Sequence, residues 1–498
     1  MADTQREVES KFDVAPDFTI GDLTELLDEN GYLQTSTVHL LSRYFDTADN
    51  RLLASRLTLR RRTGTTDTGW HLKVPGDGFR TELRWPLSTI PASLDHIPPE
   101  LHELIDPFLD GRPVIETVRL MSIRTRYQVH NADGSLRFEI DDDEVKASGV
   151  DADVAAPRWR EVEIELGPAG DSRQLPRVGE LLAKAGAVPS RSPSKLDRAL
   201  HGLPAQFALG SGTAGAAIMP YLQTQCDAIV AGHFAISAKP FETEITVDPH
   251  EAVHQTRVAT RRLRALLRTF GALFEAAPAT RLEAELRWFA AELGEVRDRE
   301  VLRARLARAV DDLPAYLVVG PVAERIDQVL LTELHQHSQA LLATMRDVRY
   351  RRLLQDLADW RQQPPFTAPA QDPAKTLSHY VAEAESRLAK RMKRASSKQA
   401  TDTDLHSARK AGKRARYAAE AARPALGKHY NSLAQAASNL QTLLGEHQDS
   451  VVATELLRRI ADELADEGEN AFTYGILVAD QRRLASESAN AAREAAGH

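Results

Sequence analysis

One basic helical motif occurs twice in this chain, with about 150 residues between the copies. In the first copy, VHQTRVATRRLRALLR at 253–268, charged residues recur at steps of three and four, the spacing that places side chains on one face of a helix. The second copy, LHSARKAGKRARY at 405–417, repeats these offsets. Each copy is followed about 40 residues later by a similar segment, LGEVRD or LGEHQD, which predicts an internal duplication. The matched positions are His254, Arg257, Arg261 and Arg264, and His406, Arg409, Lys413 and Arg416.

Two such helices that face each other would line a groove with guanidinium, ammonium and imidazole groups. These groups are donors well suited to phosphate oxygens. A basic stripe on one helix is more often a solvated surface, but repetition at matched positions, histidines included, favours a binding role. Lys413 stands where the first copy has Arg261, so the second copy keeps the charge and loses the bidentate fork.

The two motifs and their downstream segments resemble the signature segments of CHAD domains, a family of duplicated helical bundles. The resemblance covers roughly residues 215–498. It implies that the eight matched positions bind inorganic polyphosphate. Nucleic acid is an alternative partner, because phosphate contacts are blind to base sequence. The motifs lack interleaved aromatic residues for base stacking, so we expect a ligand without bases.

The first 200 residues or so follow a different pattern, with a dominant period of two. Turn segments such as PGDG and NADGS separate short runs, which predicts antiparallel strands with few helices, at about 20–30, 93–109 and 175–185. One face of strand after strand is charged. A sandwich would turn such a face to water, whereas a closed sheet with the charges inward would let acids and bases offset one another around a wet lumen.

Seven segments of this half resemble, in order, the CYTH family of triphosphate tunnel metalloenzymes. They are EVESK, RYFDTADNRLLASRLTLRRRTG, WHLKVPG, IRTRY, FEIDDDEV, WREVEIELG and SPSKLDRAL. The resemblance implies an eight-stranded antiparallel tunnel, a Mg²⁺ or Mn²⁺ cofactor and a substrate that carries a triphosphate.

The CYTH resemblance also implies roles by position. The metal-binding acids of the family are matched by Glu7, Glu9 and the glutamates of EVEIEL, which are Glu161, Glu163 and Glu165. Which two of those three glutamates bind the metal stays open. Carboxylates two residues apart on a strand point to one side, where they can share a divalent cation. Asp141 fits the pattern as a further acid. The phosphate-binding bases are matched by Lys11, Arg60, Arg62, Lys73, Arg124, Arg126 and Lys195.

The composition is that of an ordinary soluble protein, with 42% hydrophobic and 27% charged residues. The single cysteine, Cys226, excludes an internal disulfide and a cysteine-based zinc cluster. The first residues are polar, and no run approaches the roughly 18 apolar residues needed to span a bilayer, so we expect a cytoplasmic protein. The net charge of -8 gives no general attraction to polyanions, so local clusters of charge decide what binds.

Together these patterns predict an α+β multidomain protein. We expect a CYTH tunnel at 1–203, a linker of small residues at 204–216 and an all-α CHAD bundle at 217–498. The proline-rich QQPPFTAPAQDP separates the two repeats of the bundle, at about 217–362 and 374–498.

The expected activity is metal-dependent hydrolysis of inorganic triphosphate or short polyphosphate in the tunnel, with polyphosphate binding by the bundle. One alternative is hydrolysis or cyclisation of an organic triphosphate, such as thiamine triphosphate or ATP, in the same tunnel. Trp70, Trp85 and Trp159 could stack on such a ring, although packing is the more common role of tryptophan in strands. Another alternative is a module that binds polyphosphate without turnover. The oligomeric state stays open.

Overall fold

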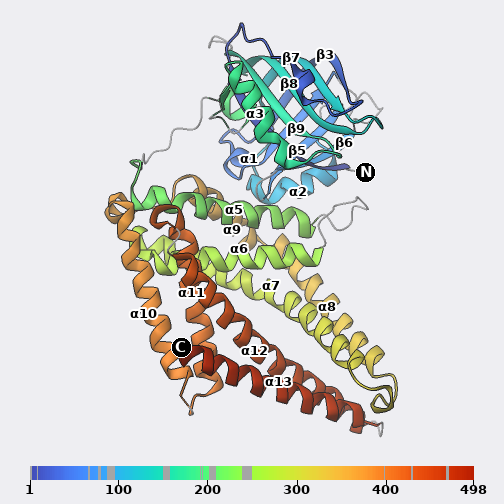
Figure 1. Cartoon of the computed structure of the whole chain (residues 1–498), viewed down its shortest axis with the longest axis vertical. Coiled ribbons are helices and arrows are strands. Elements are labelled where there is room, and N and C mark those ends of the chain that lie inside the picture. The colour runs from blue at the N-terminus through green and yellow to red at the C-terminus, as the bar shows by residue number, and fades with distance from the viewer. Residues whose placement is uncertain are drawn as a thin grey trace. The chain divides into compact units, whose positions relative to one another are not determined.

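The computed structural model describes residues 3–7, 9–64, 68–76, 80–86, 96–149, 157–190, 192, 194–200, 209–237, 249–397, 399–427, 430–466 and 470–497. Contacts divide the chain into two compact units. The first holds residues 1–206 with 233–247 and 357–362, and the second holds the rest. The first unit is built on an antiparallel sheet and the second on helices, which confirms the predicted α+β class (Figure 1).

One antiparallel sheet contains ten strand segments of the described residues, in the order β1-β6-β5-β4-β3-β7-β8-β9-β2-β10. They are β1 (Asp3–Glu7), β2 (Glu9–Val14), β3 (Tyr32–Asp46), β4 (Thr58–Thr63), β5 (Gly69–Pro75), β6 (Arg80–Pro86), β7 (Ile115–His130), β8 (Leu136–Gly149), β9 (Arg158–Leu166) and β10 (Val188–Pro189).

The N-terminal segment closes this sheet. β1 pairs with β6, β2 pairs with β9, and a single residue separates β1 from β2, so one stretch of chain joins the two ends. Counted as one interrupted strand, β1 and β2 complete the expected eight-stranded tunnel with β3 to β9, and the two-residue β10 lies beside β2.

The outer face of the sheet is apolar where helix α3 (Leu175–Lys184) covers it. Val162 and Ile164 of β9 are fully buried there, and they pack with Phe12 of β2 against Val178 and Leu182 of α3. The glutamates that alternate with them along β9 point to the other side. Each class of side chain therefore has an environment that suits it.

The other helices of this unit are short. They are α1 (Arg51–Ala54), α2 (Pro99–Leu109) and α4 (Lys195–Ala199). The helices expected at 93–109 and 175–185 are confirmed as α2, over the described part, and α3. The helix expected at 20–30 is wrong. Only Leu23–Leu26 forms a 3-10 turn, because Leu23 and Leu26, three residues apart, are both buried and Leu27 is already extended.

The helical unit repeats one order of four helices. The first set is α5 (Ala214–Ser237), α6 (Pro249–Thr269), α7 (Ala276–Asp311) and α8 (Val322–Arg346), and the second is α10 (Leu377–Ala395), α11 (Asp402–Leu426), α12 (Tyr430–Asp466) and α13 (Phe472–Gly497). Helix α9 (Val348–Gln362) and the proline-rich segment connect the sets. The longest helices match closely, with 36 residues in α7 and 37 in α12. Helix α6 packs against α11, so the two basic motifs lie on neighbouring helices.

Helix α5 begins at Ala214, inside the segment expected to be a linker. The small residues there favour a linker by composition, but alanine is also the best helix former. The Thr213 hydroxyl accepts a hydrogen bond from the backbone N–H of Ala216 at 3.3 Å and so starts the helix. Residues 204–208 of the expected linker lie outside the described residues. Of the described helices, none has the length and apolar composition of a membrane span.

Replacing Ile164 with alanine should destabilise the sheet unit by about 2–5 kcal/mol, because the side chain is fully buried and its removal leaves a cavity. Ile123 of β7 is 43% exposed, and its replacement by alanine should cost less than about 0.5 kcal/mol. Urea titration of both variants measures the difference. Equal shifts of the two midpoints would contradict the packing described.

Candidate functional site

The closed sheet surrounds a cavity of about 240 Å³ with an almost wholly charged lining. Nine cationic and five anionic side chains line it among the described residues, so cations are in excess. Ten of the predicted site residues line this cavity, namely Glu9, Lys11, Arg60, Arg62, Lys73, Arg124, Arg126, Glu163, Glu165 and Lys195. Asp141 and Glu161 lie behind this lining, in contact with its cations, and the side chain of Glu7 lies outside the described residues.

Charged residues form rows across the adjacent strands β8, β9 and β2. In the first row Glu139 pairs with Glu165, and Glu165 pairs with Glu9. The second row is Asp141, Glu163 and Lys11, and the third is Asp143, Glu161 and Asp13. Paired strands lie about 4.8 Å apart, so carboxylates within a row can share one cation.

The first row carries a surplus of negative charge. Burial and the nearby Asp141 raise the pKa of Glu139, although Arg126 opposes them. For Glu9, burial would raise the pKa, but Lys11 and Lys73 outweigh it and lower the pKa. Carboxylate oxygens grouped in this way are the ligands that Mg²⁺ and Mn²⁺ prefer, so the residues fit a divalent cation.

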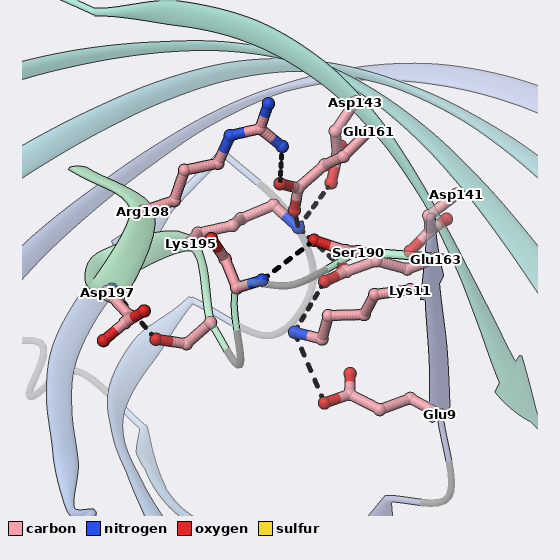
Figure 2. A network of polar contacts seen from close by, with 12 residues as sticks. Glu9, Lys11, Asp141, Asp143, Glu161, Glu163, Ser190, Lys195, Asp197 and Arg198 are labelled. Carbon is pink, nitrogen blue, oxygen red and sulfur yellow. Dashed lines mark hydrogen bonds and ion pairs between the residues drawn. The ribbon is translucent and has the colours of Figure 1, made fainter. Parts of the chain in front are cut away.

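Lys195 lies among acids of the second and third rows. Its ammonium is 3.0 Å from Oδ2 of Asp143, 2.6 Å from Oε1 of Glu161 and 2.7 Å from Oε2 of Glu163 (Figure 2). One oxygen from each of these acids lies within 4.8 Å of the others, as in a cation site. Burial would lower the pKa of Lys195, but the three acids outweigh it and hold the pKa well above its ordinary value. The lysine is thus a built-in cation of this acidic cluster.

Helix α4 holds Lys195 in position. Lys195 is the first residue of the helix, and the hydroxyl of the N-cap Ser194 accepts a hydrogen bond from the backbone N–H of Asp197 at 3.0 Å. The next residue, Leu196, is buried in an apolar cluster with Tyr44 and Leu120. The helix is only one turn long, so this apolar contact, together with the cap, fixes the direction of the lysine.

Lys11 provides a second cation among the acids. Its ammonium lies 3.4 Å from Glu9 and 2.9 Å from Glu163 (Figure 2). Glu163 therefore lies between Lys11 and Lys195, and burial, which would raise its pKa, is outweighed by these lysines, so that the pKa is well below its ordinary value. Glu163 stays ionised across the ordinary pH range.

The two arginines of β7 are held by acids of β8. Arg124 donates from Nε and Nη2 to the carboxylate of Asp143 at 2.8 and 2.7 Å. Arg126 donates from Nε to Asp141 at 3.0 Å, and its Nη2 lies 2.9 Å from Glu139. Asp141 also forms an ion pair with Arg124, so it is placed to orient both guanidinium groups. Burial would raise the pKa of Asp143, but Arg124 and Lys195 lower it to about 2.

Strands β4, β5 and β6 form a mainly cationic wall, which contains Arg60, Arg62, Lys73, Arg80 and Arg84. Glu82 of β6 lies within this wall and is fully buried. It accepts hydrogen bonds from Arg60 Nη2 at 2.8 Å and from Arg84 Nε at 2.7 Å. Burial would raise its pKa, but Arg60, Lys73 and His71 hold it well below its ordinary value. Glu82 therefore organises the wall as a charged acceptor.

Sequence reasoning missed several residues of this cavity. Arg80, Glu82 and Arg84 alternate with Leu83 and Trp85, and that period-two pattern in RTELRW was the signal that could have found them. The cavity residues that were not predicted are Tyr44, Thr58, Arg80, Glu82, Arg84, Glu139 and Ser194, and Asp143 was also missed.

The three tryptophans considered for ring stacking do not line the cavity. Trp70 and Trp85 are buried, and Trp159 donates from Nε1 to Glu161 at 2.6 Å. Tyr44 is the single aromatic residue among the described lining residues.

In the helical unit, a groove of about 910 Å³ brings the two basic motifs together. Twelve arginines and lysines, two histidines and only two acids line it among the described residues. The predicted residues in the lining are His254, Arg257, Arg261, Arg264, His406, Arg409 and Lys413. Arg416 is not among them, since it donates from Nε to Glu420 at 2.8 Å. Helix α7 adds cations that the motifs did not predict, namely Arg287, Arg297, Arg299 and Arg305.

Burial and neighbouring cations lower the pKa values of several basic groups in the groove. Burial, together with Arg261 and Arg409, lowers the pKa of Lys413 to about 6. Burial is also the largest cause that lowers the pKa of His254 and His406, and neighbouring cations add to it. The downstream segments supply the two acids, Asp298 and Asp449. Asp298 forms an ion pair with Arg257 at 3.0 Å.

The sequence matches the CYTH domain over residues 5–200 and the CHAD domain over residues 230–458. Two relatives from Mycobacterium tuberculosis, uncharacterized protein Rv2226 of strain H37Rv and uncharacterized protein MT2285 of strain CDC 1551, are each 33% identical over 496 residues. The match covers 96% of this chain and 93% of each relative.

Among solved structures, PptA from Streptomyces chartreusis is similar to 57% of this chain over 99% of its own length, with 21% identity and a TM-score of 0.46. The CHAD domain from the plant Ricinus communis is similar to 59% of this chain over 96% of its own length, with 27% identity and a TM-score of 0.45.

Replacing Lys195 with methionine should destabilise the sheet unit by about 3–5 kcal/mol, because the buried Asp143 and Glu161 and the partly buried Glu163 lose their ammonium partner. Added Mn²⁺ should restore part of the stability by entering the acidic cluster. Thermal midpoints with and without Mn²⁺ measure both effects. Arg198→Met is the control, because Arg198 is 27% exposed, pairs mainly with Asp13 and lies 3.7 Å from Glu161, farther than Lys195, so its loss should cost no more than about 1 kcal/mol. A Lys195→Met variant as stable as the unchanged chain would contradict this account.

Proposed function

The chain belongs to the proteins in which a CYTH domain precedes a CHAD domain, and on this basis we propose that its tunnel hydrolyses inorganic triphosphate or short polyphosphate with a divalent cation. The observation that carries the proposal is the lining of the cavity, where an excess of cations lies beside a row of three carboxylates. Tyr44 is the single aromatic residue of that described lining, so the cavity offers little surface for a base or thiamine ring. This favours an inorganic substrate.

The cationic wall binds the phosphate chain. Arg60 and Arg62 of β4 and Lys73 of β5 present guanidinium and ammonium donors to one side of the cavity. Guanidinium groups contact two phosphate oxygens at once, which aligns the chain as well as neutralising its charge. Glu82 keeps Arg60 and Arg84 in place, so the donors are oriented before substrate enters.

The residues that would hold Mg²⁺ or Mn²⁺ are Glu9 and Glu165 of the first row, with Glu163 of the second row beside them on β9. When bound, such an ion supplies charge neutralisation at the phosphate oxygens and lowers the pKa of a coordinated water. Glu139 has a raised pKa, which makes it a stronger base than Glu9, whose pKa is lowered. It accepts the proton of the attacking water as the new P–O bond forms and the bridging P–O bond breaks. The arginines stabilise the charge that develops on the leaving phosphate.

Replacing Glu9 with glutamine keeps the shape of the site and removes one metal-binding charge, so turnover of triphosphate should fall about 100-fold or more with a smaller effect on KM. Replacing Arg62 with alanine should lower turnover and also weaken substrate binding, because both the substrate and the transition state carry the phosphate charge that Arg62 contacts. Glu144→Gln is the matched control, since Glu144 lies on β8 and is exposed.

Phosphate release from triphosphate, longer polyphosphate, ATP and thiamine triphosphate, each with Mg²⁺ and with Mn²⁺, tests the substrate. Full activity in excess chelator, or unchanged turnover in Glu9→Gln, would contradict the proposed metal site. No phosphate release from any of these substrates would leave the tunnel as a binding module. A preference for ATP or thiamine triphosphate would replace the inorganic substrate.

For the helical unit we propose that the groove binds polyphosphate. Its described lining holds twelve arginines and lysines and only two acids. Acids outside the lining pair with some of these cations, as Glu283 does with Arg264 and Arg268, but cations remain in excess at the groove surface. A chain of phosphates, with one charge at each repeat, neutralises such a groove along its length. Both copies of the basic motif contribute, which accounts for their matched positions.

Polyphosphate binding should strengthen as pH falls from about 8 to 6, because Lys413 has a pKa of about 6 in the free groove and the polyanion favours its charged form. Any further gain at lower pH belongs to His254 and His406, whose pKa values are lowered. The affinity should change by up to about tenfold per pH unit between about pH 8 and 6, as expected for uptake of one proton. Lys413→Arg should remove most of this dependence, and Lys410→Arg is the control in the same lining. Titration calorimetry across this pH range measures it. A slope that persists in Lys413→Arg would contradict the assignment.

A further inference from the structure

A second basic cavity of about 1060 Å³ lies between helices α10 and α11. Five of its cations come from α10 and are exposed, namely Arg387, Lys390, Arg391, Lys393 and Arg394. We call these five residues the α10 surface. Neither the tunnel nor the groove described above includes them.

The α10 surface carries charge that the helix does not need for its own stability. Arg387, Lys390, Arg391 and Arg394 recur at steps of three and four, so like charges lie next to each other on one face, and such pairs destabilise a helix. The one acid of the described lining, Asp404, is used in the capping box of α11, where it accepts from the backbone N–H of Thr401 at 3.1 Å. Glu383 pairs with Arg387 alone among these cations.

Two residues connect the α10 surface to the groove. Lys410 and Arg414 of α11 line both cavities. Burial lowers the pKa of Arg414, and Arg268 of α6 and Arg387 of α10 lower it further, so this guanidinium lies in the field of both basic surfaces. Positive charge is therefore continuous from α6 across α11 to α10.

We propose that the α10 surface extends the polyphosphate groove, so that a long chain leaves the groove over Lys410 and Arg414 and continues along α10. The inference rests on the proposed binding function of the groove and adds selection by chain length. All phosphates of a short chain bind within the groove, whereas a long chain also contacts the cations of the α10 surface. The described lining of the α10 cavity holds no aromatic residue, so a ligand without bases is favoured over nucleic acid.

The test replaces Lys390, Arg391 and Arg394 with glutamine in the full chain, which keeps helix propensity and removes three charges. Affinity for long-chain polyphosphate should fall about tenfold to 100-fold, and the slope of log affinity against log salt should decrease by about two. Affinity for triphosphate should stay unchanged. The matched control removes three exposed arginines outside both cavities, Arg346→Gln, Arg458→Gln and Arg482→Gln, and should bind long chains as the unchanged chain does.

The outcomes separate this inference from the function it rests on. If the unchanged chain does not bind long-chain polyphosphate, the proposed function of the groove fails and this inference fails with it. If Arg257→Gln with Arg409→Gln weakens binding but the α10 variant does not, the groove remains and its extension is wrong. An equal loss of affinity for long-chain polyphosphate in the control variant would show that the effect comes from net charge and not from the α10 surface. If the α10 variant loses as much affinity for triphosphate as for long chains, the α10 surface is part of the groove and does not select by chain length. Tighter binding of single-stranded DNA, lost in the α10 variant, would make this a nucleic-acid surface.

Discussion

The sheet unit depends on the pairing of buried charges. A closed sheet with charged residues on its inner face must compensate each of them, because an unpaired charge away from water is far more costly than an unpaired polar group. Glu82 and Asp143 are fully buried, and each has cations beside it, with Arg60 and Lys73 near Glu82 and Arg124 and Lys195 near Asp143. Some partners lie on sequential strands, such as Arg124 of β7 for Asp143 of β8, whereas Lys11 of β2 reaches Glu163 of β9 across the strand pair that helps to close the sheet. The order of these charges is set before substrate arrives, which is the condition for electrostatic catalysis.

The groove of the helical unit follows the opposite principle. Cations predominate in its lining, and their mutual repulsion destabilises the fold. The burial of Leu263, Leu266 and Phe270 on other sides of α6 offsets this repulsion. Arg261 donates from Nη2 to the hydroxyl of Tyr417 across the two motif helices at 3.2 Å, one of the few neutral contacts available to it. Such a site gains stability when a polyanion binds, because the ligand removes the repulsion between neighbouring cations.

Periodicity predicted the strands and the helices, the CYTH resemblance implied the closed eight-stranded tunnel, and the site was predicted only in part. The period of two along β9 separates Val162 and Ile164 from the glutamates, and the steps of three and four in α6 and α11 separate the groove residues from the core. The resemblance of SPSKLDRAL marked Lys195, but its three acids come from two other strands, and no local pattern pairs them. The period of two in RTELRW could have placed Glu82 on the inner face, but its role as the acceptor for Arg60 and Arg84 is visible only once β4 and β6 lie on either side of β5 in the folded sheet. Arg416 shares the spacing of its motif, yet the nearby Glu420 is its partner.

The closure of the sheet by β1 and β2 has a consequence for the biogenesis of this protein. Strands β1 and β2 need β6 and β9 as neighbours, and β9 lies about 150 residues after β2 in the chain. Strands β1 and β2 are thus synthesised before both of their partners and take their place only after most of the tunnel exists. Contacts so distant in sequence slow folding and leave a strand edge exposed in the meantime. Nascent chains of this protein should therefore remain open to chaperones until the whole tunnel has been translated.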